Sequence, residues 1–362
     1  MASRIVVFGA TGYTGRLVAE RLVAGGVRPV LAARNEARLA ELAARLGGLE
    51  YARADALRQN TVFDLVAAGD VLVSTVGPFA KWGPPALRAS VAAGCVYIDS
   101  TGEPEFIRRV FEEFGPPAER SGAALLTALG YDYVPGALAG ALALDAAGEE
   151  AVRVDVGYYA LGGGPSSLSA GTRESLVGVT LADNHAYREG RVRLVRPAER
   201  VRSFTVAGRA REAISVGGAE HYGLPMSYPG LREVNVYLGW FGPLARPFQA
   251  GSLVGSFVQR VPGVRPALRI AGERAMAMAG GPEPGTTPGT RSWIAAEAYD
   301  GAGRALSEIH LAGEDGYAFT AAFIAWAAQQ EVSGTGALGP VQAFGLERLE
   351  EGAREAGLAR VR

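Results

Sequence analysis

Apolar residues in the first 130 positions come in short runs, and most of these runs end at a glycine or a polar residue. Segments with helical spacing of apolar residues separate them. The runs cover residues 4–8, 29–33, 51–54, 71–75, 96–99 and 124–127, and the helical segments cover 14–24, 36–46, 85–93 and 106–121. Short apolar runs are typical of parallel strands buried on both faces. Their alternation with helices predicts an α/β fold of the Rossmann type, a doubly wound parallel sheet with right-handed crossovers.

The pattern changes after residue 152. Longer runs with a period of two, such as 152–158 and 233–237, predict a mixed or antiparallel sheet. Residues 293–298 and 305–311 predict a hairpin, 317–330 a buried helix, and 346–356 an amphipathic helix. We therefore expect a Rossmann domain at 1–135, an inserted α+β domain at 136–332, and a segment at 333–362 that returns to the first domain.

Length and composition limit the class of protein. A chain of 362 residues is about right for two domains, and its net charge of -1 without a basic cluster argues against a nucleic-acid partner. Cys95 is the only cysteine, which excludes an internal disulfide and a multi-cysteine metal site, and we expect a buried core thiol. We expect no metal. No apolar run is long enough to span a membrane and no secretory signal is visible, so we expect a cytoplasmic protein.

A glycine-rich turn stands between the first expected strand and the first expected helix. In this context glycines allow a tight turn, close approach of backbone to a pyrophosphate, and close packing of helix on sheet, while N–H groups at the helix start face the phosphates. The turn therefore predicts a dinucleotide site. The cofactor-binding residues expected here are Gly9, Thr11, Gly12, Tyr13, Thr14 and Gly15.

The end of the second expected strand bears on the choice between NADH and NADPH. An acidic residue there would bind the ribose hydroxyls and repel a 2'-phosphate. This chain instead has Arg34 and Asn35, and Arg34, supported by Asn35 or Arg38, is a planar cation suited to phosphate. The sequence favours NADPH as the cofactor, with a solvated arginine as the alternative.

Two further loops follow expected strands at the same edge of the sheet. Asp55 follows the third strand, where it reaches the adenine edge or caps a helix. Thr75, Val76, Gly77, Pro78 and Phe79 leave the fourth strand, where they hold the nicotinamide half of the cofactor or form a structural loop.

The candidates for catalysis are Tyr131, Asp132 and His221. Tyr131 and Asp132 follow the sixth strand, and the alternative for Asp132 is a helix cap. His221 lies in the middle of the second domain, with a structural role or the neighbouring Tyr222 as alternatives. A short-chain dehydrogenase mechanism is excluded, because Lys81 is the only lysine and Gly77 stands where the catalytic tyrosine would be.

Four motifs together resemble the saccharopine dehydrogenase-like oxidoreductases, and are most similar to the branch of trans-acting enoyl reductases. They are residues 9–15, 75–79, 97–103 and 130–135. The resemblance implies a Rossmann domain with an inserted α+β domain and reduction of a double bond by NADPH. Family members often carry Gly-Phe-Asp-Ser before the proline, whereas this chain has Tyr131, Asp132 and Tyr133.

The leading hypothesis is an NADPH-dependent reductase that delivers a hydride to the C=C bond of an enoyl thioester or related hydrophobic metabolite. The alternatives are reduction of a C=N bond of the imine or saccharopine type, with Arg173 and Arg291 as conceivable carboxylate ligands, and a non-catalytic NADPH sensor or assembly protein. The apolar segment 237–262 could line a tunnel for an acyl chain, form a homodimer interface, belong to the core, or contact a membrane surface. The expected partner is a small-molecule or acyl-type substrate.

Overall fold

The computed structural model describes residues 4–161, 184–240, 242–258, 291–313 and 315–361. The chain forms two compact units, each of which is described by itself. Unit 1 comprises Met1–Thr101, Phe106–Val134 and Gly316–Gly357. Unit 2 comprises Gly102–Glu105, Pro135–Asp315 and Leu358–Arg362.

Unit 1 is built on a parallel sheet of seven strands in the order β15-β6-β5-β4-β1-β2-β3. The strands are β1 (Ile5–Phe8), β2 (Val30–Ala33), β3 (Tyr51–Arg53), β4 (Val71–Ser74), β5 (Val96–Asp99), β6 (Ala124–Leu126) and β15 (Gly336–Ala337). The order reverses between β1 and β4, as in a doubly wound sheet. The predicted Rossmann architecture is therefore confirmed, with β15 added at one edge.

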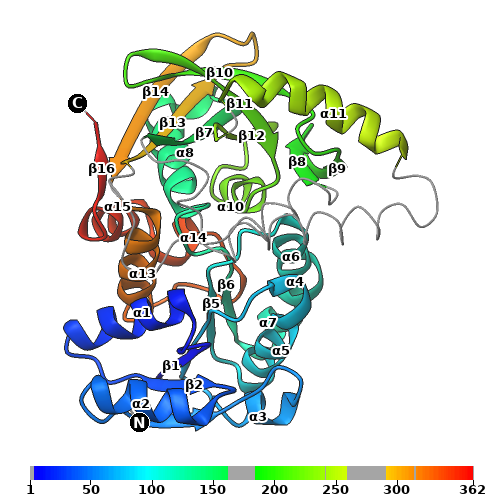
Figure 1. The fold of residues 1–362 in the computed structure, drawn as a ribbon. Helices are drawn as coiled ribbons and strands as arrows, with labels where there is room; N and C mark the ends of the chain where they lie inside the picture. Colours follow the sequence, from blue (N-terminus) through cyan, green and yellow to red (C-terminus); the bar gives the residue numbers. More distant parts are fainter. Residues whose placement is uncertain (1–3, 162–183, 241, 259–290, 314, 362) are drawn as a thin grey trace. The chain divides into compact units, whose positions relative to one another are not determined.

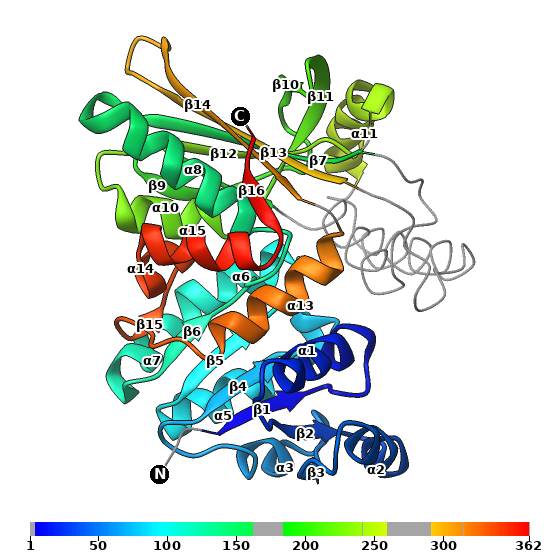
Figure 2. The same cartoon turned by 90° about the vertical axis from the view of Figure 1, so that its left-hand side faces the viewer.

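Helices connect the strands of unit 1 (Figure 1). They are α1 (Tyr13–Ala24), α2 (Glu36–Arg45), α3 (Gln59–Phe63), α4 (Phe79–Trp82), α5 (Pro84–Ala93), α6 (Pro104–Arg109), α7 (Gly115–Ser121), α13 (Gly316–Ala327), α14 (Pro340–Phe344) and α15 (Leu346–Glu355). Helix α13 packs beside α1 (Figure 2). The rings of Tyr13 and Tyr317 meet edge to face there, with their centroids 5.2 Å apart. A segment from late in the chain thus covers the first helix.

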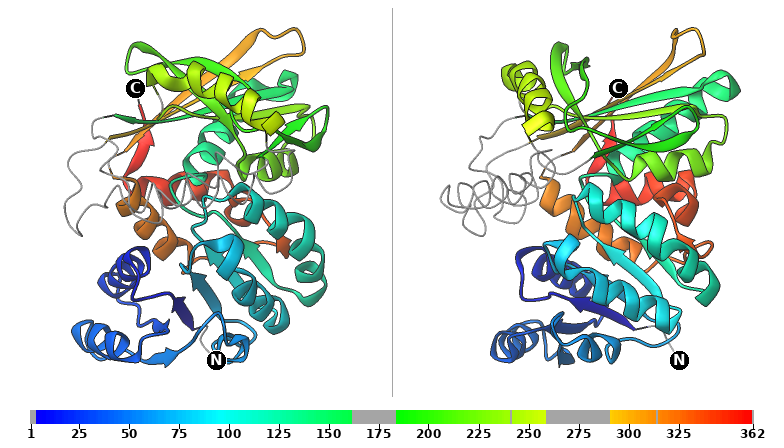
Figure 3. Two further views of the ribbon diagram at one scale, coloured as in Figure 1. Left: turned by 45° about the vertical axis from the view of Figure 1, so that its right-hand side comes forward. Right: turned by 90° about the vertical axis from the view of Figure 1, so that its right-hand side faces the viewer.

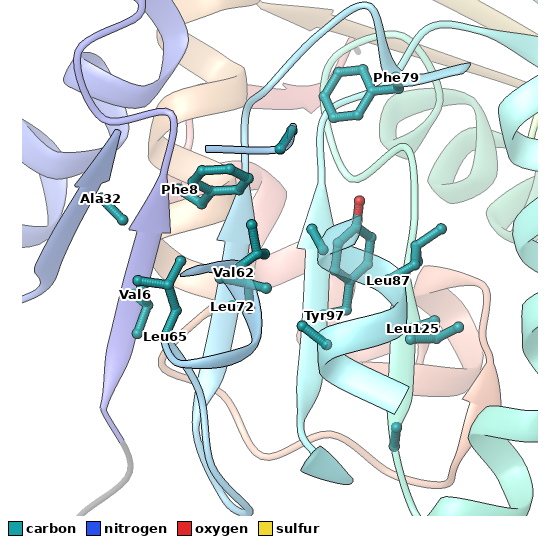
Figure 4. Close-up of a cluster of buried hydrophobic side chains, with 14 of the residues drawn as sticks. Val6, Phe8, Ala32, Val62, Leu65, Leu72, Phe79, Leu87, Tyr97 and Leu125 are labelled. Carbon is teal, nitrogen blue, oxygen red and sulfur yellow. The ribbon is translucent and has the colours of Figure 1, made fainter. Parts of the chain in front are cut away.

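The core of unit 1 follows from the apolar strands. Val6, Phe8, Leu72, Tyr97 and Leu125 come from four neighbouring strands and face the same side of the sheet (Figure 4). Each is at most 1% exposed. Full burial of one such side chain stabilises the fold by about 1.5–3 kcal/mol, so this row holds the strands in register.

The helix predicted over 106–121 is interrupted. Helix α6 passes into a π-helical turn at Val110–Phe114 before α7 begins at Gly115. Pro116 and Pro117 stand in the first turn of α7 and lack the N–H groups that a continuous α-helix would need there. The wider turn accommodates these two prolines.

Unit 2 is built on a mixed sheet of nine strands. Its main path is β10-β11-β12-β7-β13-β14-β16, with β8 paired to β12 and to β9. The strands are β7 (Arg153–Leu161), β8 (Asn184–Arg188), β9 (Arg191–Val195), β10 (Val201–Val206), β11 (Arg209–Val216), β12 (Glu233–Leu238), β13 (Arg291–Tyr299), β14 (Ala305–Gly313) and β16 (Leu358–Arg360). β12 pairs with β7 in parallel, whereas β13 and β14 form the predicted antiparallel hairpin. The expected mixed sheet is confirmed.

Helices pack on the sheet of unit 2 (Figure 3). Helix α8 (Val134–Ala147) packs on one side, where Ser307 of β14 donates to the Ala143 carbonyl at 2.6 Å. On the other side Phe204 of β10 contacts the rings of Tyr159 and Tyr237. Among the described residues of this unit, the other α-helices are α10 (Glu220–Ser227) and α11 (Ala245–Val258). No helix in the described part of the chain is long and apolar enough to cross a membrane.

The units are divided differently from the expected ranges 1–135, 136–332 and 333–362. Unit 1 resumes at Gly316, because α13 packs on α1 and β15 extends the parallel sheet beside β6. Leu358–Arg360, expected in the returning segment, instead pairs with β14 in the sheet of unit 2. The boundary near residue 135 lies one residue from the observed one.

Candidate functional site

The glycine-rich turn lies where the chain leaves β1 and enters α1. Gly9 has a φ of +93°, and a Cβ there would lie 2.6 Å from Thr75 Oγ1. A Cβ on Gly15 would lie 2.3 Å from the Gly9 carbonyl oxygen. Gly12 is the residue directly before α1, and no described side chain caps the helix there. The turn therefore requires glycine and is followed directly by the start of a helix, the arrangement that binds phosphate in dinucleotide-binding domains.

The loop after β4 lies against this turn. The Thr75 N–H donates to the Phe8 carbonyl at 2.8 Å. The Gly77–Pro78 peptide is cis, and Phe79 is buried with its ring 5.7 Å from that of Phe106. β1 and β4 are adjacent at the point where the strand order reverses, which is where doubly wound sheets bind their ligands. The structure thus brings together the two loops expected to hold the cofactor.

The end of β2 is tied to the same turn. The Ala32 carbonyl accepts the N–H groups of Gly9 and Ala10 at 2.8 and 3.1 Å. The Asn35 side chain accepts the Arg38 N–H at 3.0 Å and so caps α2. Arg34 is exposed, and among the described residues no hydrogen bond or ion pair holds its guanidinium. The case for phosphate binding by Arg34 therefore rests on its position at this edge of the sheet, because the side chain of Asn35 caps α2.

Asp55 follows β3 and forms a local turn. Its carboxylate accepts the Leu57 N–H at 3.0 Å, and its own N–H donates to Thr61 Oγ1 at 3.0 Å. Helix α3 begins after Arg58, so Asp55 does not cap it. The contact between Asp55 and adenine stays a prediction.

Tyr131 and Asp132 lie in the turn between β6 and α8. The Val134 N–H donates to the Gly130 carbonyl at 3.0 Å and closes the turn, while the Tyr131 N–H donates to Thr320 Oγ1 of α13 at 2.9 Å. Asp132 is half-buried, and desolvation by the surrounding protein raises the pKa of its carboxyl group to about 6. A carboxyl group that titrates near neutral pH is suited to proton transfer.

Asp99, at the end of β5, was missed as a site residue by sequence reasoning. It is fully buried, and burial raises its pKa to about 6, although hydrogen bonds from the N–H groups of Ala128 and Thr101 act in the opposite direction. The signal in the sequence is a carboxylate that directly ends an apolar strand. The position of Asp99 at the end of an apolar run predicts neither that its carboxylate is buried nor which groups it contacts.

His221 belongs to unit 2 and is 1% exposed. Its Nδ1 accepts the Gly218 N–H at 3.0 Å, and its ring lies 5.3 Å from that of His185. Burial, and next the positive charge that His185 can carry, hold the pKa of His221 well below 6.5. The neutral ring is thus well suited to accept the Gly218 N–H and so hold the backbone at residues 218–221. A catalytic role for His221 stays a prediction. Tyr222, the alternative, packs its ring against His185 at 5.2 Å.

The apolar segment expected at 237–262 includes α11. Phe248 packs against a small core of Ala198, Ile214 and Ala245, whereas Leu244 and Leu253 are 65% and 49% exposed. Residues 259–262 and Arg173 lie outside the described residues, and Arg291 is exposed at the start of β13. Within the described ranges no three His, Cys, Asp or Glu side chains group as metal ligands would.

Comparison with known proteins finds a matching family model, relatives by sequence, and a similar fold. A family model described as NAD(P)H-binding matches residues 9–98. A protein of Mycobacterium tuberculosis, provisionally named a trans-acting enoyl reductase, is 40% identical over 139 residues, which is 36% of this chain and 33% of that protein. A trans-acting enoyl reductase of Mycobacterium bovis is 36% identical over 137 residues, with the same coverage of 36% and 33%. The chain spans about a third of the length of these curated relatives.

The fold has a counterpart among solved structures. Apo saccharopine dehydrogenase (L-Glu forming) of Saccharomyces cerevisiae superposes with a TM-score of 0.61 at 12% identity, covering 100% of both chains. At this identity the likeness shows the fold alone. Together these findings confirm the resemblance predicted from the four motifs and an NAD(P)H-binding domain in unit 1.

Gly15→Ala tests the close approach in the glycine turn. The added Cβ would overlap the Gly9 carbonyl, so we expect unfolding to become easier by about 1–3 kcal/mol and NADPH affinity to fall at least about tenfold. Thermal unfolding and a fluorescence titration measure the two effects. Gly25→Ala is the control, because its Cβ would lie 3.4 Å from the nearest atom. Equal effects of the two substitutions would contradict this account.

His221→Gln tests the buried histidine. Because its pKa is lowered in the folded protein, the unfolded chain binds the proton more readily, and this group should cost stability as the pH falls below about 6.5. We expect the variant to lose less stability than the wild type between neutral and acid pH, measured by denaturant unfolding. His310→Gln, at an exposed pair with Glu308, is the control. A loss of turnover at unchanged neutral-pH stability would instead support catalysis by His221.

Proposed function

We propose that this protein is an NADPH-dependent reductase that transfers a hydride to the activated C=C bond of an enoyl thioester or a related hydrophobic metabolite. The observation that carries the proposal is the junction of the glycine turn with the loop after β4. Thr75 and the Gly9 carbonyl leave no space there for a side chain at Gly9 or Gly15. That junction fits a pyrophosphate at the start of α1 and a nicotinamide ring beside Gly77 and Pro78.

The residues at the end of β2 support NADPH over NADH. Arg34 is an exposed guanidinium beside the turn, and this position carries no carboxylate that would repel a 2'-phosphate. A guanidinium can bind phosphate through two parallel hydrogen bonds. Arg34 would thus hold the group that distinguishes the two cofactors.

The bound cofactor supplies the hydride and so carries the difficult chemistry. The protein must orient the acceptor and give a proton to the α-carbon once the β-carbon has received the hydride and negative charge has moved onto the thioester oxygen. Asp132 is our candidate for the proton donor, because its carboxyl group titrates near neutral pH. Tyr131, its neighbour, is the candidate for binding the developing charge.

The choice of acceptor rests on the enoyl reductase relatives, which are 40% and 36% identical to this chain over 139 and 137 residues. The alternative acceptor is a C=N bond, supported by the fold shared with a saccharopine dehydrogenase. Such chemistry would need cations for several substrate carboxylates. Arg291, the described candidate, is exposed, which makes this the weaker proposal.

A panel of enoyl thioesters, cyclic imines, and pairs of 2-oxo acid with amine tests the proposal by NADPH consumption. Turnover of an enoyl thioester supports it, and turnover of an imine alone selects the second acceptor. Tight NADPH binding without turnover of any member would contradict both and support a non-catalytic sensor.

Arg34→Ala tests the cofactor preference. Loss of a charge-assisted contact to the 2'-phosphate should weaken NADPH binding about 10- to 100-fold and leave NADH binding nearly unchanged. Isothermal titration with each cofactor measures this. Arg21→Ala, which removes an exposed arginine of α1, should change neither affinity. Equal losses for both cofactors with Arg34→Ala would overturn the assignment.

Asp132→Asn tests the proton donor. If the protonated carboxyl is required, kcat of the wild type should fall as the pH rises above about 6, because the acid form is then lost. The amide should lower kcat about 100-fold or more and remove this limb of the pH profile. Asp64→Asn, at an exposed carboxylate after α3, should leave both unchanged. A pH profile that keeps its shape in Asp132→Asn would exclude Asp132 as the donor.

A further inference from the structure

The carboxylate of Asp99 joins the ends of two neighbouring strands. One of its oxygens accepts the N–H groups of Thr101 and Ala128, each at 2.9 Å, and the other accepts the Thr127 hydroxyl at 2.8 Å. The backbone carbonyl of Asp99 also accepts the Leu129 N–H at 2.7 Å. Three consecutive residues after β6 are therefore held by one residue at the end of β5.

Ala128 shows why this stretch needs to be held. Its φ is +58°, in the left-handed region that residues with a Cβ rarely adopt. An alanine keeps this conformation only when its surroundings impose it. The hydrogen bond from the Ala128 N–H to Asp99 is one such constraint, and the neighbouring bonds of Thr127 and Leu129 are the others.

The path of the chain then leads directly to Tyr131 and Asp132. Gly130 follows the anchored stretch, and its carbonyl closes the turn by accepting the Val134 N–H. On the far side of Gly130, the Tyr131 N–H is held by Thr320, whose hydroxyl also donates to the Gly316 carbonyl at 2.8 Å. Asp99 thus holds the residues just before the turn that carries Asp132, and Thr320 holds Tyr131 within that turn.

We propose that Asp99 is a positioning residue for the reaction, which places Tyr131 and Asp132 by holding residues 127–129 in their strained path. The anchoring rests on the geometry of Asp99 itself, while its effect on turnover rests on the proposed function of Asp132. The carboxylate does not touch the acceptor or the cofactor in this role, and it neither gives nor takes a proton.

The chemistry of this site makes asparagine an informative substitute. In Asp99→Asn the amide oxygen can accept both backbone N–H groups, and the amide nitrogen can donate to the Thr127 hydroxyl, which is able to reverse its role. A positioning function therefore survives this substitution. Asp99→Ala leaves all three donors without the side-chain acceptor, and is expected to release the stretch.

Two measurements on the whole chain test the proposal. Hydrogen–deuterium exchange should quicken about tenfold or more at the amides of Ala128 and Leu129 in Asp99→Ala, and stay near the wild-type rate in Asp99→Asn. With an enoyl thioester, kcat should fall about 10- to 100-fold in Asp99→Ala with little change in the KM for NADPH, and remain within about threefold of wild type in Asp99→Asn.

A second substitution keeps the test decisive if Asp99→Ala alone folds poorly. Glycine adopts a positive φ without strain, so adding Ala128→Gly to Asp99→Ala should restore part of the lost kcat. Ala128→Gly by itself is the matched control and should stay close to wild type. Absence of any rescue in a folded double variant would contradict a role through the backbone of Ala128.

The outcomes separate this inference from the proposed function. Unchanged exchange in Asp99→Ala overturns the anchoring, whatever the enzyme reduces. Faster exchange with unchanged kcat overturns the link to turnover. A large loss of kcat in Asp99→Asn, with exchange as in wild type, would assign Asp99 to proton transfer instead. If the wild type reduces no member of the acceptor panel, the proposed function fails, while the exchange measurement still decides the anchoring.

Discussion

The close approach of three backbone segments at the end of β1 is the constraint on which the rest of unit 1 depends. The carbonyl of Gly9 occupies the space that a side chain at Gly15 would fill, and Thr75 fills the space beside Gly9. Helix α1 can begin at this point only because those side chains are absent. The start of a helix directly after such a turn is where dinucleotide-binding domains hold phosphate, so the close packing of helix on sheet and the proposed phosphate site have one cause.

This constraint also explains which features could be predicted from the sequence. Strands β1, β2, β4, β5 and β6 are mainly buried, and each is predicted by a short apolar run in the sequence. Gly9, Gly12 and Gly15 mark the turn between the first strand and the first helix. These signals are local, because burial on both faces and conformational freedom at glycine each leave a mark on a few consecutive residues. The hairpin of β13 and β14 could be predicted for the same reason.

Other features depend on contacts between distant segments and leave no such mark. Gly336 and Ala337 form a strand only because the edge of β6 is there to pair with them, and Leu358–Arg360 pairs with β14 and not with unit 1. Two partners of the Asp99 carboxylate, Thr127 and Ala128, lie 28 and 29 residues later in the chain, so a carboxylate after a strand gave no sign of its role. In unit 2, likewise, Asp155 is nearly fully buried beside Arg202, a pairing that alternation along β7 could not reveal.

The discontinuity of unit 1 has a consequence for the order of events during synthesis. When the ribosome has made the first 134 residues, β6 is still an open edge, because the N–H groups of Gly336 and Leu338 are the donors to its Ala123 and Leu125 carbonyls. The face of α1 that α13 covers is also bare at that stage. The nucleotide-binding unit must therefore remain unfinished while about 180 residues of unit 2 emerge. An exposed strand edge over that interval is a site where chains can pair with one another, which makes the late segment Gly316–Gly357 a protection against aggregation as well as a part of the fold.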